Sequence, residues 1–173
     1  MYDICCIGHI TLDKVVTTKG EKHMAGGTSI YFSNALRNMD IRYCLVTSLA
    51  ESEMRFVDDM RANGITVKAL SGALTVYFEN IYSHNLDHRF QRVLQTADSF
   101  TVDQLHDTDA TIFHLGPLLA NDIPLELIKV LAKKGRVSLD VQGYLREVIN
   151  QNVCAVDWAD KREALQDIEI LKA

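Results

Sequence analysis

Short apolar runs alternate with helical patterns along this chain. Residues 3–8 form an apolar run that ends at a glycine, which predicts a strand buried on both faces. Further strands are predicted at residues 41–49, from residue 65, and at residues 111–115 and 136–140. Helices are predicted at residues 30–39, 53–63, 124–134 and 161–166. This alternation of strand and helix predicts a parallel sheet covered by helices.

The first two helical segments each show one apolar face. The positions predicted to be buried are Phe32, Ala35, Leu36 and Met39 in the first helix, and Phe56, Val57 and Met60 in the second. Gly64 is predicted to end the second helix, because glycine readily adopts the left-handed conformation found there.

Two parts of the chain depart from this alternation. Residues 76–82 and 90–94 are strand-like with no helix between them, which predicts two antiparallel strands outside the main sheet. Residues 168–171 begin like another core strand, and the sequence ends directly after them. Because α/β proteins place functional residues after such strands, we expect the sequence to be a fragment.

Composition and charge narrow the range of partners. With 173 residues, 47% hydrophobic and 24% charged, the chain is expected to form one compact domain. A net charge of −5 argues against a nucleic-acid partner and favours a small molecule. No apolar stretch approaches the roughly 18 residues of a membrane span, and the cysteines show no C-x-x-C spacing. We therefore expect a cytoplasmic protein without a membrane partner.

Histidines give no clear metal site. His84 and His88 have the spacing of metal ligands on a helix, but their segment is predicted to be a solvated loop. His9 is predicted to have a structural role, and no metal ligand is assigned.

Several residues have types and positions suited to a binding site. Asp13 follows Gly8 by five residues, and an ionised carboxylate can hold two donors at once, although the spacing also fits an exposed turn. Gly26 and Gly27 precede a helix, where they either allow a ligand to approach the backbone or form only a tight turn. Tyr31 is predicted either to form an apolar wall or to pack in the core.

A second cluster of candidates follows a later strand. Residues 137–140 end at Asp140, and Arg146 lies six residues further on. A guanidinium there would steady a phosphoryl group, while the simpler interpretation is a surface ion pair with Glu147 or Asp140.

Taken in order, the motifs resemble the substrate-binding N-terminal part of ribokinase/PfkB-family carbohydrate kinases. They are Gly8 to Asp13, the Gly26–Gly27 pair, His114-Leu-Gly-Pro-Leu118, and the segment 137–146. The resemblance spans nearly all of residues 1–173. It implies a ribokinase-like, Rossmann-type three-layer α/β/α fold, C-terminally truncated, with a mostly parallel sheet. A small antiparallel β lid is implied around residues 11–24 and 75–101.

The resemblance also implies roles for individual residues. The implied substrate-binding residues are Thr11, Asp13, Gly26, Gly27 and Tyr31. Asp140 and Arg146 are implied to lie on the path of the phosphate or its metal ion.

The departures from the family pattern shape the functional expectation. Many family members carry an asparagine where this chain has Ile30 or Tyr31, which favours a cyclitol such as inositol over ribose. The Gly-Ala-Gly-Asp motif that supplies the base is absent, so the base is expected beyond Ala173. We expect a full-length parent to use ATP and Mg²⁺, and this chain alone to bind neither and to be inactive. The alternatives are a nucleoside kinase and a non-catalytic polyol-binding module, and a homodimer through the lid fits either function.

Overall fold

A parallel sheet forms the centre of the protein in the computed structural model, which describes residues 1–84 and 87–173. Its strand order is β12-β9-β8-β1-β4-β5, and every neighbouring pair is parallel. The strands are β1 (Tyr2–Ile7), β4 (Tyr43–Leu49), β5 (Thr66–Ser71), β8 (Ala110–Leu115), β9 (Arg136–Asp140) and β12 (Ile170–Lys172). The predicted parallel sheet is therefore confirmed. β12 differs from the prediction in burial, because its three residues are exposed.

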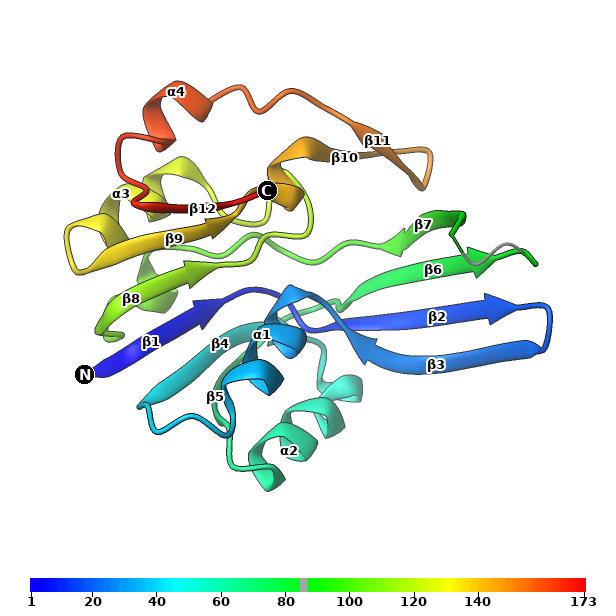
Figure 1. The fold of residues 1–173 in the computed structure, drawn as a ribbon, viewed down its shortest axis with the longest axis horizontal. Coiled ribbons are helices and arrows are strands. Elements are labelled where there is room, and N and C mark those ends of the chain that lie inside the picture. The colour runs from blue at the N-terminus through cyan, green and yellow to red at the C-terminus, as the bar shows by residue number, and fades with distance from the viewer. Residues whose placement is uncertain (85–86) are drawn as a thin grey trace.

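Helices cover both faces of this sheet (Figure 1). They are α1 (Thr28–Leu36), α2 (Arg55–Ala62), α3 (Leu125–Ala132) and α4 (Lys161–Ala164), with short 3₁₀ turns η1 (Glu51–Glu53), η2 (Asp103–Leu105) and η3 (Val141–Leu145). Cys6 packs in the cluster that contains α1 and α2, whereas its neighbour Cys5 packs in the cluster that contains α3 and α4. This alternation buries β1 on both faces and gives three layers, as predicted.

A second six-stranded sheet extends from the carboxyl ends of the parallel strands (Figure 1). Its order is β10-β11-β7-β6-β2-β3, with β2 (Thr11–Thr17), β3 (Gly20–Gly26), β6 (Val76–Tyr82), β7 (Arg89–Gln95), β10 (Arg146–Ile149) and β11 (Asn152–Ala155). The predicted antiparallel pair outside the main sheet is confirmed as β6 and β7. Residues 85–86, within the expected lid segment 75–101, lie outside the described residues.

The hairpin of β10 and β11 was not predicted. Its strands have only four residues each, too few to show a clear alternation of apolar and polar positions. The turn between them is formed by Asn150 and Gln151, both with positive φ, of 50° and 66°. Two consecutive left-handed residues are typical of the tight turns that join antiparallel strands.

The face of α1 agrees with the prediction only in part, since Phe32 and Leu36 pack against the core, while the face of α2 agrees with it. Ala35 and Met39 are exposed, and the buried residues of α1 are Ser29, Ile30 and Ser33. Ser29 donates through Oγ to the backbone oxygen of His9 at 2.7 Å, and Ser33 donates to that of Ser29 at 2.6 Å. Because these hydroxyls are satisfied internally, α1 buries a polar stripe that apolar periodicity does not reveal.

Two further sequence predictions concern the cysteines and membrane-spanning helices. Cys5, Cys6 and Cys44 are buried with free thiols, and Cys154 is half-buried and also free. Among the described residues, no helix combines the length and apolar character needed to cross a membrane.

Candidate functional site

The site lies where the connections of the parallel sheet diverge. The chain runs from β1 to β4 and β5 on one side, then returns to β8 and β9 on the other. Connections that leave neighbouring strands in opposite directions open a crevice at the carboxyl ends of those strands. Here Gly8 and Gly116 follow β1 and β8, and a Cβ atom on Gly8 would lie 2.8 Å from the Gly116 oxygen. Glycine at this position lets the two backbones touch.

A cavity of about 170 Å³ opens beside this crevice. It is lined by five of the residues predicted from the sequence: Thr11, Asp13, Gly27, Tyr31 and Arg146. They come from β2, from the start and first turns of α1, and from the start of β10. Residues separated by more than 130 positions in the sequence thus share one cavity.

Asp13 is held by a chain of hydrogen bonds that crosses three strands of the second sheet. Its Oδ1 accepts from the Thr11 hydroxyl at 2.6 Å, and its Oδ2 accepts from Asn80 Nδ2 at 3.4 Å. Asn80 Oδ1 in turn accepts from Gln91 Nε2 at 2.8 Å. These contacts fix the direction of the carboxylate and leave acceptor capacity for a ligand.

Sequence analysis missed Asn80 and Gln91. Asn80 alternates with Val76 and Phe78 along β6, and all three are buried. A buried amide at a position that follows the apolar alternation was the available signal, because buried polar groups need partners.

The electrostatics of Asp13 follow from its position. Burial raises the pKa of Asp13 above its ordinary value, while the Thr11 hydrogen bond, the charge of Arg89 and the Asn80 hydrogen bond oppose that rise. The buried, ionised carboxylate has therefore lost part of its hydration, and hydrogen bonds from ligand hydroxyls can replace it.

The paired glycines have distinct roles. A Cβ atom on Gly26 would lie 2.6 Å from Asp13 Cγ and 2.8 Å from Thr11 Oγ1. A Cβ atom on Gly27 would lie 2.6 Å from the backbone oxygen of His9, and Gly27 has a φ of 97° at the start of α1. Gly26 therefore makes room for the carboxylate, although it is not itself part of the cavity lining, and Gly27 permits the sharp entry into the helix.

Tyr31 lies at the cavity and not in the core. Its side chain is 61% exposed on α1 and lines the same cavity as Asp13. The prediction of a core aromatic is wrong, and an aromatic wall agrees with the observed position.

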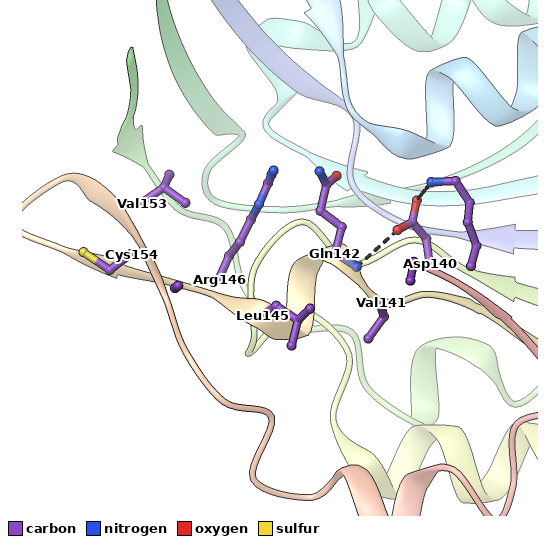
Figure 2. Close-up of a pocket in the computed structure, with 10 residues that line it drawn as sticks. Asp140, Val141, Gln142, Leu145, Arg146, Val153 and Cys154 are labelled. Carbon is purple, nitrogen blue, oxygen red and sulfur yellow. Dashed lines mark hydrogen bonds and ion pairs between the residues drawn. The ribbon is translucent and has the colours of Figure 1, made fainter. Parts of the chain in front are cut away.

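A larger cavity of about 550 Å³ lies next to the first and contains Asp140 (Figure 2). Asp140 is buried at the end of β9, where its Oδ1 accepts from the backbone N–H of Gln142 at 3.2 Å. Its Oδ2 accepts from Lys172 Nζ at 2.8 Å. Gln142 and Arg146 line both cavities and extend in the same direction in Figure 2. Asp140 thus lines the larger cavity and is not part of the lining that contains Asp13.

Arg146 has no carboxylate partner in the part of the chain that the structure describes. The predicted ion pair with Asp140 or Glu147 is wrong, because Asp140 pairs with Lys172 and no ion pair of Arg146 is formed within 4.0 Å. Burial lowers the pKa of Arg146, the charge of Arg89 lowers it further, and Asp140 opposes both effects.

The described residues contain no cluster of side chains that would hold a metal ion by itself. Across residues 1–84 and 87–173, no group of three or more His, Cys, Asp or Glu side chains is arranged to hold a metal ion. Asp140 already accepts from Lys172 and from a backbone N–H.

Two buried histidines near the site have structural partners. Nδ1 of His9 lies 3.2 Å from the Ser48 backbone oxygen, and its ring packs on Phe100. His114 stacks on Phe32 with ring centroids 3.9 Å apart, and burial lowers its pKa to about 4. The structural role of His9 stays a prediction, because its buried Nε2 has no hydrogen-bond partner among the described residues.

Comparison with solved structures identifies the fold. A pyrophosphate-dependent kinase of the ribokinase family, in a sulfate complex, aligns with a TM-score of 0.90, 26% identity, 97% coverage of this chain and 60% of its own. A pyrophosphate-dependent kinase of that family bound to a pyrophosphate analog and myo-inositol aligns with a TM-score of 0.89, 25% identity, and 97% and 60% coverage. Ribokinase from Arabidopsis thaliana, complexed with ribose and ATP, aligns at 0.69, with 17% identity and 98% and 59% coverage.

These matches define the class of the protein. No family model and no curated protein sequence matches the chain. The chain spans about 60% of the length of the solved structures that it matches. The chain therefore has a ribokinase-like fold and matches an N-terminal part of ribokinase-family kinases, as its motifs predicted.

Proposed function

We propose that this chain forms the acceptor-binding part of a small-molecule kinase whose acceptor is a polyol, with a cyclitol such as inositol ahead of ribose. The observation that carries the proposal is the position of Asp13, which faces the cavity and is oriented by Thr11 and Asn80. A half-buried carboxylate with spare acceptor capacity suits vicinal hydroxyl donors. The similarity to a kinase solved with myo-inositol supports the cyclitol.

The other predicted residues have proposed roles around this anchor. Gly26 leaves the space that Asp13 occupies, Gly27 brings backbone close to the ligand, and Tyr31 forms a wall. Arg146 is proposed to contact the transferring phosphoryl group, with Asp140 along its path. Similar structures include both pyrophosphate-dependent kinases and a ribokinase solved with ATP, so the donor is proposed to be ATP or pyrophosphate.

The second sheet is proposed to act as the lid. Within the segments 11–24 and 75–101, β2 supplies Asp13 and β6 and β7 supply Asn80 and Gln91. A homodimer through the lid and a cytoplasmic location stay predictions. We assign no general base to the described residues of the cavity, and we expect no turnover by this chain alone with either donor.

Calorimetric titration tests the acceptor. We expect the chain to bind myo-inositol more tightly than ribose or inosine. Asp13→Asn is expected to weaken myo-inositol binding about 10- to 100-fold, because hydrogen bonds to a charged group contribute about 1.5–3 kcal/mol. Asp98→Asn is the matched control, since Asp98 is exposed and does not line the cavity.

The titrations separate the alternatives. Tightest binding of inosine would favour a nucleoside kinase, and unchanged myo-inositol binding by Asp13→Asn would refute the proposed anchor. Phosphorylation of myo-inositol by the chain with ATP or pyrophosphate would contradict the assignment of no base.

A further inference from the structure

Two arginines face the same cavity as Asp13. Arg89 lies at the start of β7 and Arg146 at the start of β10, and both line the cavity of about 170 Å³. In the described part of the chain, neither forms an ion pair with an Asp or Glu side chain, whereas Arg92 on β7 pairs with Glu79 at 3.3 Å. Asp13 is the acidic side chain in the lining, so the cavity carries more positive than negative charge.

The two guanidinium groups are close enough to influence each other. The charge of Arg89 lowers the pKa of Arg146 and also opposes the rise in the pKa of Asp13. Arginine does not relieve such repulsion by losing its proton, because the guanidinium keeps its proton in proteins at neutral pH. An anion between the two groups would replace the repulsion with charge-assisted hydrogen bonds.

The charge of the cavity is local. The whole chain has a net charge of −5, so two arginines that form no ion pair with the described residues do not follow from composition. Such a local concentration of positive charge attracts anions, and the planar guanidinium matches the geometry of phosphate oxygens.

We propose that Arg89 and Arg146 form an oxyanion subsite inside the hydroxyl-binding cavity. The cavity then takes hydroxyl groups at Asp13 and a phosphate group at the arginines. The inference deepens the proposed function, on which it rests for the role of Asp13. Two kinds of molecule carry a phosphate group that fits this subsite: a polyol with a phosphate ester, and a phosphate donor bound beside the polyol.

Calorimetry at low ionic strength tests the subsite with four probes: myo-inositol, myo-inositol 1-phosphate, inorganic phosphate and pyrophosphate. We expect at least one phosphate-bearing probe to bind at least tenfold more tightly than myo-inositol. Arg89→Gln is expected to weaken binding of that phosphate-bearing probe at least tenfold more than it weakens binding of myo-inositol. Arg92→Gln is the matched control, because Arg92 lies on the same strand but does not line the cavity.

Arg146→Gln is a second variant. It is expected to lose the preference for the phosphate-bearing probe over myo-inositol. Simultaneous binding of myo-inositol with phosphate or pyrophosphate would assign the subsite to the donor. Competition between myo-inositol 1-phosphate and myo-inositol, with no binding of the free anions, would assign it to the acceptor. Both results support the subsite and name its source.

The subsite and the proposed function fail separately. The subsite is overturned if no phosphate-bearing probe binds more tightly than myo-inositol, or if Arg89→Gln keeps the preference. In that case Asp13-dependent myo-inositol binding still supports the proposed function. Phosphate binding that depends on Arg89, without any myo-inositol binding, would overturn the proposed function and keep the subsite. Absence of binding by every probe would overturn both.

Discussion

Gly26→Ala tests whether the position of the Asp13 carboxylate determines binding. The added Cβ atom would lie 2.6 Å from Asp13 Cγ and nearer still to Asp13 Oδ2, whereas ordinary contact begins at 3.4 Å, so the carboxylate must move by about 1 Å. A shift of that size breaks the alignment of the 2.6 Å hydrogen bond from Thr11 and of the ligand hydroxyls. Losing the alignment of one charge-assisted bond, worth about 1.5–3 kcal/mol, predicts a roughly 10- to 100-fold weaker Kd for myo-inositol.

The stability of the same variant needs a matched control. Overpacking costs about 1–3 kcal/mol, which lowers Tm by roughly 2–4 °C per kcal/mol for a domain of this size. Gly20→Ala lies at the other end of the same hairpin, with a φ of 140° and no atom within 4 Å of the added Cβ. It is expected to lose stability through backbone strain and to keep its affinity. Unchanged myo-inositol affinity in Gly26→Ala, measured by calorimetry, would refute the role of Asp13 as anchor.

Three further predictions concern charge, burial and the cavity wall. Because burial raises the pKa of Asp13, its ionised form lowers the stability of the folded chain at neutral pH. Asp13→Asn is therefore expected to raise the Tm of the unliganded chain, and this gain in Tm is expected to shrink as pH falls. A lower Tm would contradict this. The pKa of His114 is lowered from 6.5 to about 4 in the folded state. The folded chain is therefore expected to have its full stability above pH 6.5 and to lose about 3 kcal/mol of it as pH falls toward 4. Denaturant titrations at several pH values should show that His114→Gln flattens this dependence, and an unchanged slope would refute the assignment. Tyr31→Ala should leave stability within about 0.5 kcal/mol but weaken myo-inositol binding about three- to tenfold, and equal affinity would exclude the wall.

The sequence predicted the main sheet because its signals are local. The apolar runs of β1, β4 and β8 mark strands buried on both faces, and Gly64, with a φ of 82°, ends α2 where predicted. The sequence did not predict which polar residues are buried. Ser29 and Ser33 are buried in α1 because their hydroxyls find backbone acceptors, and such partners cannot be read from periodicity.

The sequence by itself determined the alternation of strands and helices, the resemblance to a kinase family and the residue types at the site. Only the tertiary structure decided which of those residues meet. The sequence assigned Asp140 and Arg146 to one phosphate path. In the structure, Asp140 lines the larger cavity alone, whereas Arg146 lines both cavities. Arg89 enters the site from β7, although nothing in its local sequence distinguishes it from Arg92. The physical reason is that strand pairing and the twist of two sheets set distances between side chains far apart in sequence, and charges interact through those distances.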